Sequence, residues 1–165
     1  MTDSTWRRAR FLVVEALYEA ETSSHDPEAV YNRRVEEVAE EDAELAGPGP
    51  SGFGRGVLRG VLRKQEELDA FIGEAAPKYA VDTLPVVDRN ILRLAIWELL
   101  SDNSAPVAAV VNEAVELAHR YGGESSPAFV NGVLRTVSKR IRAESPDGGQ
   151  ADQTTPPSPT ETQEN

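Results

Sequence analysis

The strongest candidates for chemistry in this sequence are three arginines and a tryptophan near the N-terminus, in the segment Trp6-Arg7-Arg8-Ala9-Arg10. A guanidinium binds phosphate through paired hydrogen bonds and stacks on nucleobases, and an indole ring stacks as well. In a helix these guanidiniums lie within about one and a half turns, at the end where the helix dipole favours anions. The segment therefore indicates a phosphate-binding surface, with RNA as the natural ligand. It is also typical of the solvated start of an amphipathic helix, and the segment alone does not separate the two interpretations.

The sequence contains no arrangement of residues typical of catalysis or metal binding. The chain has no cysteine, which excludes disulfides and thiolate metal sites. Its two histidines, His25 and His119, lack a neighbouring His, Cys or Asp at the spacing of metal ligands. The segment G-F-G-R-G at residues 52–56 is rich in glycine, but no predicted strand precedes it, as a phosphate-binding loop requires. We therefore predict a protein that is not an enzyme, with no catalytic residues, no metal and no cofactor.

The net charge is acidic, but its distribution is uneven. The chain has 165 residues, enough for one domain with a substantial core, and a formal net charge of -11. The acidic excess lies in residues 11–46 and 143–165, whereas residues 1–10 carry a net positive charge. Because the position of charge matters more than its sum for association with nucleic acid, the overall acidity does not exclude RNA as a ligand.

The sequence shows no sign of a membrane-spanning or targeting segment. No apolar run approaches the roughly 20 residues that cross a bilayer. The N-terminus is charged and then amphipathic, unlike a signal peptide. The absence of cysteine is compatible with a reducing compartment. We therefore expect a cytoplasmic protein without membrane contact.

Apolar residues recur at spacings of three and four along most of the chain, which predicts helices. Proline and glycine mark their ends, as at Pro85, at Pro106 and at the pair Gly122-Gly123. No segment shows sustained alternation with a period of two, so we predict an all-α fold without a sheet. The six predicted helices cover residues 5–22, 26–46, 51–73, 85–100, 106–121 and 126–143.

Three of these helices have features that predict their place in the fold. The helix at 26–46 has a thin apolar stripe, so it should lie on the surface. The helix at 85–100 is apolar around most of its circumference, so it should be central and buried. In the helix between them, Gly52, Gly56 and Gly60 share one face, which indicates close approach of another backbone. The spacing does not decide whether that contact is internal or between subunits.

Four motifs stand out when the whole chain is considered. They are W-R-R-A-R-x-x-x-V-E-A-L-Y at residues 6–18, D-R-N-I-L-R-L-A-I-W-E-L at 88–99, P-V-A-A-V-V-N-E-A-V-E-L-A-H-R-Y-G at 106–122 and S-S-P-A-F-V-N-G-V-L at 125–134. In this order and spacing they resemble the NusB family of bacterial transcription antitermination factors. The resemblance covers residues 6–142 and implies a bundle of about six to seven helices, arranged as two packed three-helix halves.

The resemblance and the composition together predict two parts of the chain. Residues 1–143 should form a NusB-like helical RNA-binding domain. Residues 144–165 are acidic and rich in proline, threonine and serine, with almost no apolar side chains. Such a segment buries too little apolar surface to fold, so we expect a disordered tail.

The resemblance also implies a function in transcription. NusB-like proteins pair with the small-subunit ribosomal protein NusE, and the pair binds boxA-type single-stranded RNA within the transcription elongation complex. The bound pair helps RNA polymerase read through terminators and helps ribosomal RNA mature. The family includes both monomers and dimers, so a homodimer stays open.

Residues that match the family's motifs acquire expected roles. Tyr18 and Phe129 are expected near RNA, although each could instead be a core aromatic. Asp88 is expected at the NusE interface, although it could be an exposed carboxylate without a partner. Trp6 stands where some family members have a basic residue. This difference would lower the affinity of the chain alone for RNA and make binding depend more on the protein partner. The predicted RNA-binding residues are Arg7, Arg8, Arg10, Tyr18, Arg89, Arg93 and Phe129.

Two of these arginines come from the predicted central helix. Arg89 and Arg93 match basic positions of the family, and their spacing of four places them on one helix face. We expect them to join the first helix and Phe129 in one composite RNA-binding face.

Two other functions also fit the sequence. A helical scaffold that binds only proteins could have the same fold, and the arginines would then have no role in binding. A NusB-like domain also serves RNA recognition in ribosomal RNA cytosine methyltransferases. Such an enzyme needs a long C-terminal cofactor domain, which these 165 residues do not contain.

Overall fold

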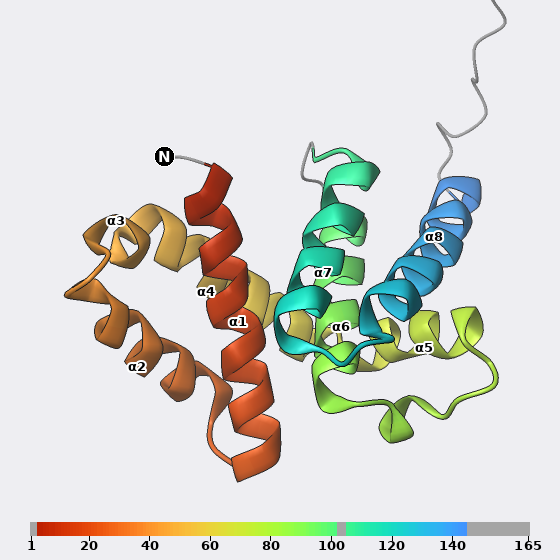
Figure 1. Ribbon diagram of the computed structural model, residues 1–165, viewed down its shortest axis with the longest axis horizontal. Coiled ribbons are helices and arrows are strands. Elements are labelled where there is room, and N and C mark those ends of the chain that lie inside the picture. The colour runs from red at the N-terminus through yellow and green to blue at the C-terminus, as the bar shows by residue number, and fades with distance from the viewer. Residues whose placement is uncertain (1–2, 102–104, 145–165) are drawn as a thin grey trace, which may run out of the picture.

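The computed structural model describes residues 3–101 and 105–144, and this part of the chain is built from helices without a strand (Figure 1). The prediction of an all-α fold is confirmed. The helices outnumber the six to seven expected. They are α1 (Asp3–Ser23), α2 (Pro27–Ala39), α3 (Ala43–Ala46), α4 (Pro48–Arg63), α5 (Gln65–Ala75), the 3-10 helix η1 (Val81–Thr83), α6 (Val86–Leu100), α7 (Val107–Tyr121) and α8 (Ser126–Glu144).

The helices form two groups that lie side by side. In Figure 1, α1 to α4 lie on the left and α5 to α8 on the right. Within the first group α1 packs on α2 and α4, and within the second α6, α7 and α8 pack on one another. Helix α1 also contacts α6, so these two helices join the groups. Each group has three longer helices at its core, as the expected halves require.

Helix α6 lies at the centre of the fold, as its apolar circumference predicts. It packs against α1, α4, α5, α7 and α8. Most side chains along its length are buried, including polar ones that face the seam with α1. Its fully buried apolar residues are Ile91, Leu92, Leu94, Ala95 and Ile96.

The prediction of one helix over residues 26–46 is wrong, because the chain turns after Ala39. The side chain of Asp42 accepts a hydrogen bond from the backbone N–H of Leu45 at 3.0 Å and caps the separate helix α3. An aspartate that captures a backbone N–H in this way favours a new helix start over a continuous helix. The segment is also less superficial than expected, since Val30, Tyr31 and Leu45 are buried.

The prediction of one helix over residues 51–73 is also wrong. Helix α4 ends at Arg63, and Lys64 leaves the helical backbone region with φ -106° and ψ 16° before α5 begins. The turn lets α4 pack on α1 while α5 packs on α6 and α8. Leu68 and Ile72 of α5 are fully buried by this arrangement. Tertiary burial therefore overrides a helical periodicity that continues across the break.

The glycine face of α4 differs from the expectation at two of its three positions. Nothing lies within 4 Å of the place where a Cβ would stand at Gly52 or Gly56. At Gly60 a Cβ would overlap the indole ring of Trp97 on α6. The close neighbour at Gly60 is therefore a side chain of the same chain, and the predicted approach of a second backbone within the chain along this face is wrong; a contact between subunits stays a prediction.

The last two helices agree with the sequence. Helix α7 follows Pro106 and ends at Tyr121, and α8 begins at Ser126. From residue 145 on, the predicted tail lies outside the described residues. Among the residues that the structure describes, no helix is long and apolar enough to cross a membrane.

Candidate RNA-binding surface

The arginines of α1 occupy the side of the helix that is not committed to the core. The opposite side is buried against α2, α4 and α6, because apolar residues recur there at helical spacing. The buried residues of this side are Ala9, Leu12, Val13, Ala16, Leu17 and Ala20. With that side fixed, Arg7 and Arg8 point outward, with side chains 45% and 49% exposed.

Each arginine of α1 is held by a carboxylate from a different part of the chain. Arg7 donates to Glu113 of α7 through Nε at 2.9 Å and Nη2 at 2.8 Å. Arg8 binds Asp42, the cap of α3. These carboxylates keep 23% and 19% of their side-chain surface exposed. Ion pairs at such exposed positions contribute about 0 to 1 kcal/mol, so they hold the arginines only weakly.

Arg10 differs from its two neighbours because its partner is buried. Its Nε donates to Glu98 Oε1 at 2.7 Å, and the Glu98 side chain is 1% exposed. Burial raises the pKa of Glu98 above its ordinary value of 4.5, and the Arg10 guanidinium opposes this shift. Arg10 also lies 5.1 Å from the centre of the Phe53 ring. We assign to Arg10 a structural role, joining α1 to α6.

Trp6 is anchored in the same corner of the fold. Its ring meets that of Phe53 edge to face, with ring centres 4.9 Å apart and an interplanar angle of 85°. The indole is partly buried, so part of its surface remains accessible beside Arg7.

Tyr18 lies on the exposed side of α1, with 44% of its surface accessible. It borders a cavity of about 390 Å³ between α1, α2, α6 and α7. Opposite it, the hydroxyl of Tyr121 donates to Glu15 at 2.6 Å. Burial raises the pKa of Tyr121 to about 12, which keeps that hydroxyl a donor. The position of Tyr18 suits a stacking role better than a core role.

Phe129 is partly buried at the start of α8 and belongs to an aromatic pair. Its ring lies edge to face with that of Tyr79, at 6.1 Å and 89°. Tyr79 is 56% exposed, more than the other large apolar side chains described. Tyr79 is not among the residues predicted from the sequence. The only signal was an aromatic residue in the linker between two predicted helices.

Arg89 and Arg93 share one face of α6, as their spacing predicts, but that face is in the interior. Both residues are 6% exposed. Arg93 donates to Asp69 of α5 through Nε at 2.7 Å and Nη2 at 2.9 Å. Arg89 binds Glu21 of α1 and the backbone carbonyl of Asp82 at 3.1 Å. With these partners, the guanidiniums serve the packing between helices and do not extend the exposed face of α1.

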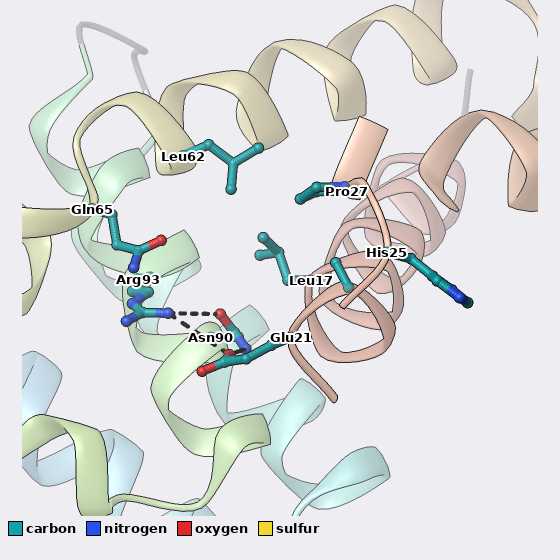
Figure 2. Close-up of a pocket in the computed structure, with 9 residues that line it drawn as sticks. Leu17, Glu21, His25, Pro27, Leu62, Gln65, Asn90 and Arg93 are labelled. Carbon is teal, nitrogen blue, oxygen red and sulfur yellow. Dashed lines mark hydrogen bonds and ion pairs between the residues drawn. The ribbon is translucent and has the colours of Figure 1, made fainter. Parts of the chain in front are cut away.

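Figure 2 shows the pocket beside this network, where Asn90 and Arg93 of α6 point toward Glu21 of α1. Asn90 Nδ2 donates to Glu21 at 2.9 Å, and Arg93 Nη1 donates to the Asn90 side-chain oxygen at 3.2 Å. His25 lines the same pocket, of about 230 Å³, but lies 3.5 Å from Glu19 and outside the network. Within the described ranges, no three metal-ligating side chains come together.

Asp88 is not the exposed carboxylate that the sequence left open. It lies in the first turn of α6 and is 5% exposed. Its Oδ1 is buried and has no hydrogen-bond partner among the described residues. A buried acceptor without a donor is costly, but this atom is closed to solvent, so a donor from outside the chain can reach it only if its neighbours move.

Known proteins similar to this chain share both its sequence and its fold. Residues 7–139 match the sequence pattern of the NusB family. The transcription antitermination protein NusB of Roseiflexus castenholzii is 41% identical over 140 residues, which cover 84% of this chain and 94% of that protein. The structure of T. maritima NusB matches with a TM-score of 0.70 and 34% identity, covering 81% of this chain and 90% of that chain.

A third similar protein was solved in a complex. The crystal structure of the antitermination factors NusB and NusE in complex with dsRNA matches with a TM-score of 0.70 and 27% identity. The match covers 84% of this chain and 99% of that chain. None of these three relatives is a methyltransferase. The sequence match across nearly all of the helical part, together with the shared fold, shows that the chain belongs to the NusB family of non-enzymatic transcription antitermination factors.

Proposed function

We propose that this protein is a transcription antitermination factor that binds boxA-type single-stranded RNA together with the ribosomal protein NusE. It would act in the transcription elongation complex, in the cytoplasm, and support transcription and maturation of ribosomal RNA. The observation that carries the proposal is the pair Arg7 and Arg8, about half exposed on α1 and paired with the partly exposed carboxylates of Glu113 and Asp42. Guanidiniums so placed can exchange a carboxylate for a phosphate.

The side of α1 that faces α7 offers a path for the RNA. Arg7 and Tyr18 are eleven residues apart, about three helical turns, so they lie on nearly the same side of α1. Between them, Arg120 of α7 lies 4.7 Å from the centre of the Phe11 ring. Alternating cations and aromatic rings are typical of surfaces that bind single-stranded nucleic acid. Phe129 and its neighbour Tyr79 offer a second aromatic platform for a base.

Replacing Arg7 and Arg8 together by alanine should lower RNA affinity about tenfold, because two phosphate contacts are lost. The slope of log K against log salt should also become shallower, by about 0.7 for each lost contact. Stability should change by less than about 1 kcal/mol, since both ion pairs are exposed. Fluorescence anisotropy with a boxA-type RNA at several salt concentrations measures the first two quantities.

The matched control is Arg59→Ala on α4. Arg59 is 59% exposed and paired with Glu28, so it resembles Arg7 in exposure and pairing but lies away from the start of α1. It should leave RNA binding unchanged. Because Arg59→Ala removes one positive charge and the double variant removes two, a loss of binding free energy half as large in the control would mean that the effect is one of net charge. Absence of binding by the unaltered protein, with and without NusE, would refute the proposed function.

Asp88 is our candidate contact for NusE. Asp88→Asn removes the charge while preserving the shape, and we expect it to weaken NusE binding about tenfold. RNA binding by the protein alone should not change, because Asp88 lies beside the C-terminal end of α1, where its neighbour Arg89 binds Glu21, whereas Arg7 and Arg8 lie near the N-terminal end of α1. Calorimetric titration with purified NusE tests this, and unaltered NusE affinity in the folded variant would remove Asp88 from the interface.

A further inference from the structure

The α1 arginines proposed to bind RNA already hold carboxylates of the same chain. We propose that Glu113 and Asp42 act as intramolecular competitors of RNA phosphate, and so limit the affinity for RNA that lacks other contacts. The inference rests on the proposed function. It adds two residues that determine affinity, neither of which is expected to touch the RNA.

Geometry favours competition at Arg7. Glu113 Oε1 and Oε2 accept from Nη2 and Nε of Arg7 at 2.8 and 2.9 Å, the two donors that would face a phosphate. A bidentate carboxylate and a bidentate phosphate therefore require the same edge of the guanidinium. RNA can contact this edge only after Glu113 has moved away.

The surroundings leave room for that exchange. The Arg7–Glu113 pair borders a groove of about 330 Å³ between α1 and α7, whose lining also includes Trp6, Arg10 and Ala109. A phosphate entering this groove meets the Arg7 guanidinium from the solvent side. The small side chain of Ala109 leaves the groove open along α7.

Asp42 competes with phosphate for Arg8 in the same way, and its two oxygens have different partners. Oδ1 accepts the backbone N–H of Leu45 and caps α3, whereas Oδ2 binds Arg8. The cap needs only an acceptor, which an asparagine also supplies. The negative charge of Asp42 is thus not required for the helix start, and its effect on Arg8 can be tested separately.

Burial limits the competition to these two pairs. Glu113 and Asp42 are partly exposed, whereas Glu98, the partner of Arg10, is 1% exposed. A phosphate outside the protein would have to displace a carboxylate from the interior to reach Arg10. The ion pairs of Arg7 and Arg8 can therefore exchange with phosphate, whereas the ion pair of Arg10 stays in place.

Exchange leaves a carboxylate close to the bound phosphate, and the two repel each other. RNA that makes only phosphate contacts must overcome this repulsion with little gain, since it replaces one ion pair by another. RNA that also stacks on aromatic side chains, or that arrives with a protein partner, has additional contacts. The competitors thus lower the sequence-independent part of binding, which otherwise dominates at basic surfaces.

Glu113→Gln and Asp42→Asn test the proposal because both preserve the shape of the side chain while removing its negative charge and one of its two acceptor oxygens. Each should tighten binding of an unrelated single-stranded RNA by about two- to fivefold, and the double variant by about the product. Fluorescence anisotropy with boxA-type RNA and with unrelated RNA of equal length measures the gain. Circular dichroism confirms that each variant is folded.

Two controls separate competition from a change in net charge. Glu28→Gln removes the same charge and releases Arg59, whose pair lies on α2 and α4. It should not tighten RNA binding. In the background of Arg7→Ala, Glu113→Gln should bring no gain, because the arginine that it releases is missing.

The possible results distinguish this inference from the proposed function. If the unaltered protein binds RNA and Arg7→Ala weakens it, but Glu113→Gln and Asp42→Asn bring no gain, only the competition is refuted. An equal gain with Glu28→Gln refutes it as well. If neither the unaltered protein nor any variant binds RNA, with or without NusE, both the function and the competition are refuted.

Discussion

Replacing Arg10 by alanine is expected to lower the free energy of unfolding by about 3 kcal/mol at pH 7. The guanidinium is the partner of Glu98, whose side chain is 1% exposed, so its removal leaves a buried carboxylate without a cation. Arg7→Ala, three residues earlier on the same helix, should cost less than about 1 kcal/mol because its pair is exposed. Urea unfolding of the two variants measures the difference.

The loss in the Arg10→Ala variant should depend on pH in a defined direction. Burial already raises the pKa of Glu98 above 4.5, and removing Arg10 raises it further, since the cation stabilises the charged form. A raised pKa in the folded state means that protonated Glu98 favours folding, and that this contribution is lost as pH rises through the folded pKa. The difference in the free energy of unfolding between the Arg10→Ala variant and the unaltered protein should therefore be largest at neutral pH and decrease toward pH 4.5.

Adding Glu98→Gln to Arg10→Ala should restore part of the stability at pH 7, because the buried site then carries no charge. An equal loss at pH 7 and near pH 4.5, or no recovery in the double variant, would show that the buried carboxylate is not the cause. In that case the contact of Arg10 with the Phe53 ring would explain the loss instead.

Gly60→Ala is expected to destabilise the protein by about 2 kcal/mol, while Gly56→Ala stabilises it by up to about 1 kcal/mol. Both glycines lie inside α4, so both gain the same helical propensity on substitution. They differ in their surroundings, since a Cβ at residue 60 overlaps the Trp97 indole and a Cβ at residue 56 meets nothing. Trp97 packs against the core and has little freedom to move aside.

Thermal unfolding of the two glycine variants, followed by circular dichroism, tests this contrast. Replacing Trp97 by leucine in the Gly60→Ala background should relieve the overlap and reduce the cost of the alanine. Similar stability changes at residues 56 and 60 would contradict the packing that we describe between α4 and α6.

Local patterns in the sequence were sufficient for α1, α6, α7 and α8, because their apolar periodicity agrees with their ends at proline, glycine or serine. The breaks at Asp42 and Lys64 were not predictable in the same way. At Asp42 a side chain caps the backbone of the next helix, and at Lys64 the apolar spacing continues while the chain turns. At Asp42 a local cap competes with the continuing helix, whereas at Lys64 contacts with distant helices decide between two local structures of similar stability.

The arginines show where a motif stops being informative. A spacing of four places Arg89 and Arg93 on one face of a helix, but it does not reveal whether that face is inside or outside. Only Glu21 and Asp69, from two other helices, show that it is inside. In the same way Arg10 looks identical to Arg7 and Arg8 in the sequence, and its separate role depends on Glu98, 88 residues away.

The separation between Arg7 and Glu113, 106 residues along the chain, has a consequence for synthesis. Helix α1 leaves the ribosome early, whereas α7 follows only after most of the domain has been translated. Until then Glu113 does not exist to neutralise Arg7, and the nascent chain presents that cation in the immediate neighbourhood of ribosomal RNA. The finished protein differs from its own unfinished form in this respect, because translation of α7 supplies the charge that holds the arginine.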